Sequence, residues 1–275
     1  MYKLIVCDLD ETLLDSEKKI CQKNIDAIKK AREMGVKFIP ATGRGYTCID
    51  YVLNTLDLYD LEGEYAISTN GAIVTENKGF RHVSYHGLSN DVAMEIVHFG
   101  IEKGLCVQAF TAKDIYTFNI NEDEKKWLFM FKPDAVLCPD LNTEFLESME
   151  IVKVMFQHTD VKYLESFMDE LSDKIKDATT ISYSSNRYME FTAKGIDKGT
   201  ALRELTQLLG VDLKETIAIG DNNNDLSMLK VAGVSAAVGN ATQEIKEFCD
   251  YQAACKNGEG AVAEIIEKYI LQDAE

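Results

Sequence analysis

The sequence predicts an α/β protein with a Rossmann-like, doubly wound parallel sheet as its core and an inserted α+β cap domain. Two observations lead to this fold class. Strand-like apolar runs alternate with helical segments toward both ends of the chain, whereas strands in pairs around two helices occupy its middle. The expected domains are an α/β core at 1–82 and 188–275 and the inserted cap at 83–187. A chain of 275 residues is long enough for two such cores.

The core is expected to begin with a buried strand at 3–7, which is a short apolar and β-branched run. A helix, a strand, a second helix and a third strand are expected next, at 22–34, 36–41, 46–58 and 65–68. Asn70-Gly71 then predicts a hairpin that breaks the alternation. The core resumes with alternating strands and helices at 188–192, 198–209, 216–220, 225–232 and 234–238.

The inserted cap has a different order of elements. A helix is expected to open at Ser89, and another to span 161–175. Its strands are expected at 105–110, 115–118, 151–156 and 180–184. Its aromatic residues Trp127, Phe129 and Phe131 are expected in the cap core rather than on a substrate platform.

The charge balance restricts the class of partner. With 29 basic and 46 acidic residues, the formal net charge is −17, which repels nucleic acid polymers and anionic membrane surfaces. A small phosphorylated metabolite is still compatible as a ligand, because a metal ion or basic pocket beside it outweighs the more distant field of the net charge. The seven cysteines are odd in number and form no Cys-x-x-Cys pair, and no signal-peptide or membrane-spanning pattern is present. We therefore expect free thiols and a cytoplasmic location.

Four polar clusters follow predicted strands of the core or stand at a helix start beside them. They are Asp8-Leu9-Asp10-Glu11-Thr12, Thr42-Gly43-Arg44, Gly195-Ile196-Asp197-Lys198-Gly199 and Gly220-Asp221-Asn222-Asn223-Asn224-Asp225. Ligands bind at the carboxyl ends of the strands in open parallel sheets. The four clusters are therefore expected to converge on one crevice.

Convergence would bring together the carboxylates of Asp8, Asp10, Asp221 and Asp225, which repel one another unless a cation neutralises them. A set of oxygen ligands without histidine or cysteine selects a hard ion. A phosphate-bearing substrate favours Mg²⁺ over Ca²⁺ as that ion. The pattern therefore predicts a Mg²⁺ site.

The same crevice would hold groups suited to an anion. Lys198 adds positive charge, the Thr42 hydroxyl adds a donor, and Gly43 allows main-chain amides to approach closely. Such a clamp fits phosphoryl transfer. Asp8 could then act as the nucleophile and Asp10 as the general acid/base. We expect the pKa of Asp10 to be raised, since it would lie in a dry site beside another carboxylate.

In this order, the four clusters resemble the motifs of the haloacid dehalogenase superfamily of phosphatases, and their spacing resembles its Cof-type subfamily, which has a large inserted cap. The resemblance covers essentially the whole chain and implies that Asp8 is the nucleophile and Asp10 the general acid/base. It implies phosphate binding by Leu9, Thr42, Gly43, Lys198 and Asn224. It also implies Mg²⁺ held by the Asp8 carboxylate, the Asp10 main-chain carbonyl and Asp221, with support from Asp225.

Two other functions fit the same residues. One is a phosphomutase that returns the phosphoryl group to a sugar, and the other is a non-catalytic sensor of a phosphorylated metabolite. An intact nucleophile and acid/base pair argue against the sensor, since binding needs neither. Sugar phosphates, pyridoxal phosphate, flavin mononucleotide and nucleotides are all compatible substrates. Arg44 is either a substrate contact or an exposed charge, and Asn70 is a turn residue that could also line the cleft.

Overall fold

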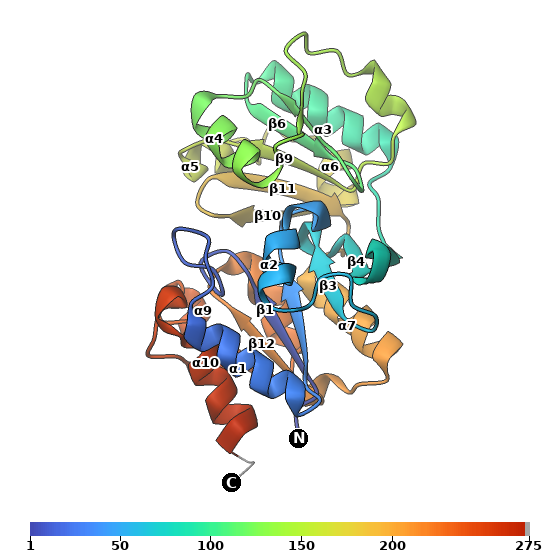
Figure 1. The fold of residues 1–275 in the computed structure, drawn as a ribbon. Coiled ribbons are helices and arrows are strands. Elements are labelled where there is room, and N and C mark those ends of the chain that lie inside the picture. Colours follow the sequence, from blue (N-terminus) through green and yellow to red (C-terminus); the bar gives the residue numbers. More distant parts are fainter. Residues whose placement is uncertain (273–275) are drawn as a thin grey trace. The chain divides into compact units, whose positions relative to one another are not determined.

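The chain folds into two compact units in the computed structural model, which describes residues 1–272. The first unit combines Met1–Tyr46, Asp50–Ser84 and the chain from Asp197 onward. The second combines Thr47–Ile49 and Tyr85–Ile196, so in sequence it interrupts the first. Figure 1 follows the chain through both units, each of which has its own sheet. The predicted α/β class is confirmed.

The sheet of the first unit is parallel over most of its width. In spatial order its strands are β14 (Tyr251–Gln252), β13 (Val234–Ala237), β12 (Thr216–Gly220), β1 (Leu4–Asp8), β2 (Lys37–Ala41), β3 (Tyr65–Ser68), β4 (Ile73–Glu76) and β5 (Arg81–Tyr85). Pairing is parallel from β14 to β3 and becomes antiparallel at the β3–β4 hairpin. Strand β1 lies between β12 and β2 with every residue buried, as expected for a strand covered on both faces.

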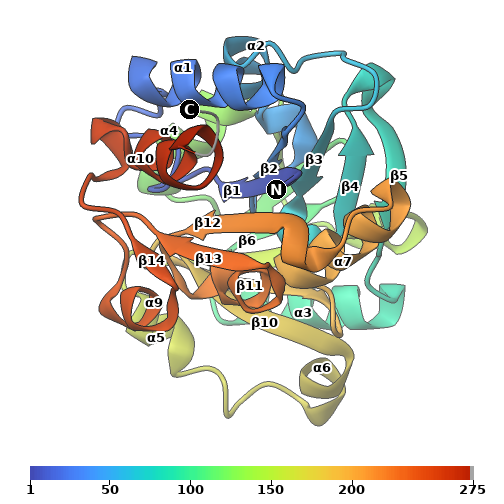
Figure 2. The ribbon, with the colours of Figure 1, turned by 90° about the horizontal axis from the view of Figure 1, so that it is seen from below.

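Helices cover both faces of this sheet. They are α1 (Gln22–Glu33), α2 (Asp50–Thr55), α7 (Lys198–Leu209), α8 (Leu226–Val231), α9 (Gln243–Phe248) and α10 (Ala261–Ile266). Figure 2 shows α1 and α10 together on one face and α7 on the other. Helix α7 begins after Asp197, whose side chain accepts a hydrogen bond of 2.8 Å from the Thr200 N–H. This cap fixes where the first residue of α7, Lys198, leaves the loop.

The second unit has a mostly antiparallel sheet packed on helices. Its strand order is β10 (Thr179–Ser184), β11 (Tyr188–Ala193), β9 (Lys153–Gln157), β6 (Cys106–Phe110), β7 (Ile115–Phe118) and β8 (Val136–Leu137). Its helices are α3 (Asn90–Glu102), α4 (Glu122–Phe131), α5 (Val161–Glu165) and α6 (Asp173–Ala178). Side chains such as Ile96, Val107 and Phe156 form its apolar core.

One strand was assigned to the wrong sheet from the sequence. The run at 188–192 was expected in the parallel core, but β11 pairs antiparallel with β10 and β9 in the second sheet. A short turn joins β10 to β11, which keeps the two strands adjacent. Met189 and Phe191 also alternate with more polar neighbours, a pattern that suits an antiparallel strand better than a strand buried in a parallel sheet.

Two further expectations for the inserted segment were wrong. The helix predicted at 161–175 is divided into α5 and α6, because the Ser172 side chain accepts a hydrogen bond from the Ile175 N–H and starts a new helix. Helix α4 turns Leu128 inward, whereas Trp127, Phe129 and Phe131 remain partly exposed outside the apolar core. Within residues 1–272 all seven cysteines are free thiols, and no helix has the length and hydropathy needed to cross a membrane.

Candidate active site

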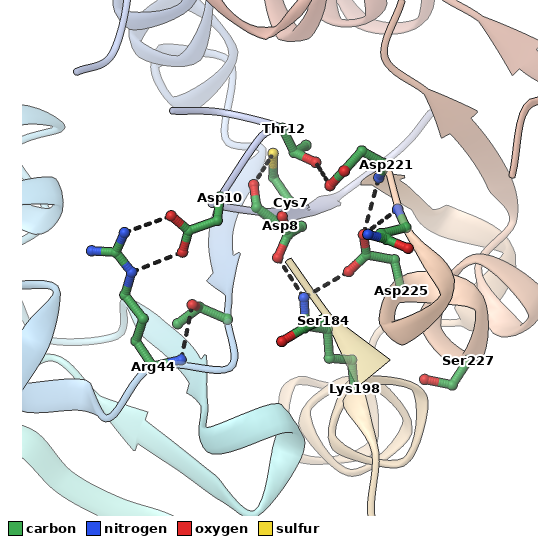
Figure 3. Close-up of polar contacts among 12 residues, drawn as sticks. Cys7, Asp8, Asp10, Thr12, Arg44, Ser184, Lys198, Asp221, Asp225 and Ser227 are labelled. Atoms are coloured by element: carbon green, nitrogen blue, oxygen red, sulfur yellow. Dashed lines mark hydrogen bonds and ion pairs between the residues drawn. The ribbon is translucent and has the colours of Figure 1, made fainter. Parts of the chain in front are cut away.

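The site is built around Asp8, the last residue of the central strand β1. Its carboxylate is buried, and its Oδ1 accepts a hydrogen bond of 2.5 Å from the Lys198 Nζ. The same ammonium lies 2.6 Å from the Asp225 Oδ1, so it bridges two acidic side chains (Figure 3). Residues that are far apart in sequence therefore meet at the carboxyl end of β1.

Lys198 is fully buried at the amino end of α7, where a helix dipole disfavours a cation. Burial alone would lower the pKa of Lys198. The carboxylates of Asp225 and Asp8 outweigh that effect and raise this pKa above its ordinary value. The lysine is therefore held as a charged group whose position depends on its two partners.

Asp225 organises the loop that follows β12. It ends the 3-10 turn Asn223–Asp225, and its Oδ2 accepts hydrogen bonds from the N–H groups of Asp221, at 3.0 Å, and Asn222, at 3.2 Å. The side chain packs so closely on Gly220 that a Cβ there would lie 2.6 Å from the Cβ of Asp225. Only glycine fits under this contact, which explains the Gly-Asp pair at the end of β12.

Three carboxylates form a cluster that can hold a cation. One oxygen from each of Asp8, Asp221 and Asp225 lies within 4.8 Å of the others, and all three residues are buried. Thr12 Oγ1 donates a hydrogen bond of 2.8 Å to the Asp221 Oδ1. Both oxygens of Asp225 accept hydrogen bonds, whereas the Oδ2 atoms of Asp8 and Asp221 accept none from residues 1–272. This donor set fits a hard, oxygen-liganded cation.

Burial and mutual repulsion both raise pKa values in the cluster. Burial, followed by the charge of Asp225, raises the pKa of Asp8 from 3.8 to about 7. Burial and the neighbouring carboxylates of Asp225 and Asp8 likewise raise the pKa of Asp221. A cation among these oxygens would remove the repulsion and favour the ionised forms.

The Asp10 side chain was expected among the other carboxylates, but it points toward Arg44 (Figure 3). Its carboxylate forms two hydrogen bonds with the Arg44 guanidinium, from Nε to Oδ2 at 2.8 Å and from Nη2 to Oδ1 at 2.5 Å. The Lys18 Nζ lies 2.9 Å from the same Oδ1. Burial raises the pKa of Asp10, but these two cations outweigh burial and bring it below its ordinary value. The expected rise in this pKa is therefore wrong for this arrangement, because two cations contact the Asp10 carboxylate directly.

The remaining predicted residues lie in the loops around this cluster. Thr42 is buried directly after β2, and its Oγ1 accepts a hydrogen bond of 3.1 Å from the Arg44 N–H. Leu9 is buried, and its carbonyl accepts the N–H groups of the turn that follows. Gly43 is half-buried beside Thr42, and Asn224 is half-buried in the same turn as Asp225. The structure thus unites the side chains of Asp8, Lys198, Asp221 and Asp225, whereas that of Asp10 turns to Arg44.

Sequence reasoning missed two polar residues of the site and left a third undecided. Thr12 lies in the first cluster, and its place in the turn that follows Asp8 was the available signal. No sequence signal marked Lys18, which depends on a small hairpin in which Leu14 bridges Asp10 and Ile20. Arg44 was the undecided residue, and the structure shows that its guanidinium donates two hydrogen bonds to the Asp10 carboxylate.

Comparison with known proteins identifies the family of the chain. The family model for haloacid dehalogenase-like hydrolases matches residues 5–266. The chain belongs to this family. Its resemblance to the superfamily and its predicted enzyme class, a phosphatase of the haloacid dehalogenase type, are confirmed.

Relatives match along almost the whole of this family member. YxeH of Bacillus subtilis, which is provisionally named a phosphatase, is 31% identical over 271 residues, or 98% of this chain and 99% of that protein. A phosphoglycolate phosphatase of Methanobrevibacter smithii is 29% identical over 97% of this chain and 98% of its own. The solved structure of a haloacid dehalogenase-like hydrolase from Bacteroides thetaiotaomicron has a TM-score of 0.83 at 30% identity, covering 98% of this chain and 99% of that one.

Proposed function

We propose that this phosphatase hydrolyses small phosphorylated metabolites, such as sugar phosphates, through an aspartyl-phosphate formed on Asp8. The observation that carries the proposal is the asymmetric environment of this carboxylate. Oδ1 is held by Lys198 at 2.5 Å, while Oδ2 accepts no hydrogen bond from residues 1–272. A fixed carboxylate with one uncommitted oxygen is suited to attack phosphorus.

The chemistry divides between the two aspartates of the first cluster. In the first step an Asp8 oxygen bonds to phosphorus, the bond from phosphorus to the leaving oxygen breaks, and protonated Asp10 gives its proton to that oxygen. In the second step water attacks the phosphorus of the aspartyl-phosphate, the bond from phosphorus to the Asp8 oxygen breaks, and the water gives a proton to Asp10. This step releases inorganic phosphate and restores both residues. The ion pairs of Asp10 with Arg44 and Lys18 suit the second step, where it must accept a proton. We propose that these ion pairs loosen when substrate binds, so that Asp10 can be protonated for the first step.

Other residues of this site would bind the phosphoryl group. Lys198 supplies a buried positive charge beside Asp8, and the Thr42 hydroxyl and the main-chain N–H groups of Leu9 and Gly43 are donors at the carboxyl ends of neighbouring strands. The half-buried Asn224 supplies a side-chain amide in the loop after β12. Thr42 follows β2, and β1 lies between these two strands. These donors would stabilise the charge that spreads over the phosphoryl oxygens during transfer.

Mg²⁺ is the proposed cofactor. The Asp8 carboxylate and the uncommitted Oδ2 of Asp221 would bind it, with the main-chain carbonyl of Asp10 as a third ligand. Asp225 would support this site by fixing the Asp221 loop, because both of its oxygens are already engaged. When bound, the ion would neutralise the carboxylates and polarise the phosphoryl group.

The experiment is a screen for release of inorganic phosphate. Sugar phosphates, phosphoglycolate, pyridoxal phosphate, flavin mononucleotide and nucleotides would be tested with Mg²⁺, with EDTA, and with EDTA followed by excess Mg²⁺. We expect hydrolysis only when Mg²⁺ is available, because the buried carboxylates need a hard cation. Activity that survives complete chelation would contradict the metal assignment. An isomerised sugar phosphate without free phosphate would identify a phosphomutase instead.

A further inference from the structure

The turn after β3 has an unusual backbone. Thr69, Asn70 and Gly71 all have positive φ, at 54°, 55° and 94°. Glycine adopts this region freely, but threonine and asparagine do so at a cost. Strained conformations persist where the surrounding structure holds them, and they are concentrated at ligand-binding sites.

Main-chain contacts on both sides hold this turn against the candidate active site. The Asn70 N–H donates to the Thr42 carbonyl at 3.0 Å, and the Thr69 N–H donates to the Arg44 carbonyl at 2.8 Å. On the other side, a Cβ on Gly71 would lie 2.1 Å from the carbonyl oxygen of Asp197, the residue before Lys198. Asn70 is thus fixed between the Thr42 loop and the start of α7, which both carry groups proposed to bind phosphate.

The Asn70 side chain has no partner inside the protein. It is 5% exposed, and neither its Oδ1 nor its Nδ2 forms a hydrogen bond within residues 1–272. Buried amides are almost always hydrogen-bonded, because an unpaired polar group loses its hydration without compensation. A carboxamide that is buried, unpaired and held by a strained backbone needs a partner that comes from outside the chain.

A purely conformational role does not account for this residue. Asparagine is common in left-handed turns because its short side chain hydrogen-bonds the nearby backbone. Asn70 makes no such bond within the described residues. Asn77, which is also buried and follows the next strand, has right-handed backbone angles, and its Nδ2 donates to the Leu58 carbonyl at 3.0 Å while its Oδ1 has no partner within the described residues.

We propose that Asn70 is a substrate-binding residue whose Nδ2 donates a hydrogen bond to an oxygen of the bound phosphoryl group. This rests on the proposed function. Phosphoryl oxygens at the site accept hydrogen bonds but do not donate them, so the NH₂ group is the matching half of the carboxamide. A neutral amide also suits a position between the Thr42 loop and the start of α7, because a carboxylate there would repel an anionic substrate.

The test is the affinity of the full chain for inorganic phosphate, measured by calorimetry with Mg²⁺ present. Asn70→Gly keeps the positive φ but removes the carboxamide, and Asn70→Asp keeps the shape but replaces the donor by a charge. We expect Asn70→Gly to weaken phosphate binding about tenfold and Asn70→Asp to weaken it more. The matched control, Asn77→Ala, should lower the unfolding midpoint and leave phosphate affinity unchanged.

The outcomes separate this inference from the proposed function. If wild type and Asn70→Gly bind phosphate equally, Asn70 only shapes the turn and the inference is overturned, while the proposed function stands. If wild type binds no phosphate with Mg²⁺ present, both fall together. Should Asn70→Gly fail to fold, Asn70→Ala, which also removes the carboxamide without adding a charge, takes its place: unchanged phosphate affinity overturns the inference, and weakened affinity supports it.

Discussion

Replacing Asp8 with asparagine is expected to abolish phosphate release. An amide cannot form the aspartyl-phosphate, and loss of a nucleophile lowers kcat by a factor on the order of 10⁴ or more. The fold should survive, because the substitution preserves shape and places a neutral group where burial and Asp225 already raise the pKa of the acid to about 7. Steady-state phosphate release and thermal unfolding, measured on the same preparations, test both expectations.

The pH dependence of the folding stability is a second test of the role of Asp8. A carboxyl group with a raised pKa in the folded state stabilises the fold only while it is protonated. In metal-free wild type its contribution should therefore be lost as pH rises from 3.8 to about 7. Asp8→Asn cannot lose that contribution, so its unfolding midpoint at mildly alkaline pH should not fall below that of wild type. Asp26→Asn, at an exposed position on α1, is the control for activity. Substantial turnover by Asp8→Asn would contradict the covalent mechanism and favour direct attack by water.

Replacing Lys198 with methionine is expected to damage both catalysis and stability. The ammonium is fully buried between Asp8 and Asp225, so its loss leaves two carboxylates facing each other without a counter-charge. Removing one partner of a buried ion pair typically costs about 3–5 kcal/mol in the free energy of unfolding. Loss of one preorganised charge at the phosphoryl group should lower kcat by a factor of about 10² to 10³.

Two measurements and one control variant separate the two roles of Lys198. Urea unfolding without metal reports the stability loss, which Mg²⁺ should reduce by neutralising the buried carboxylates. Phosphate release under conditions where the variant is folded reports the catalytic loss. Lys230→Met, on the exposed side of the neighbouring helix α8, should change neither. A folded Lys198→Met protein with kcat within about threefold of wild type would show that the lysine is structural only.

The convergence of the motif residues could be predicted from the sequence because it depends on chain topology. Asp8 ends β1, Thr42 directly follows the neighbouring parallel strand β2, and Asp221 follows β12 on the other side of β1. Once the strands are identified, their carboxyl ends must lie along one edge. Only the meeting of Lys198 with Asp8 and Asp225 needed the further fact that α7 starts beside that edge.

The details that sequence reasoning missed depend on side-chain direction and on short irregular segments. Asp10 was expected to stay beside Asp8, but its direction is decided by Arg44 and by Lys18, whose hairpin carries no turn motif. The unpaired carboxamide of Asn70 depends on three successive positive φ angles, of which Asn-Gly signals only part. Strand β11 was misplaced because apolar runs do not reveal which sheet a strand joins.

The central claim is that a phosphoryl group is bonded to Asp8 during turnover, and trapping that group tests it most directly. Asp10→Asn would be mixed with ³²P-labelled para-nitrophenyl phosphate, whose leaving group needs no acid, and quenched in acid. Because this variant lacks the base that activates water, aspartyl-phosphate should accumulate as a hydroxylamine-labile label on the peptide that contains Asp8. Asp8→Asn should carry no label. Release of nitrophenol by Asp10→Asn without any label on the Asp8 peptide would contradict the covalent mechanism.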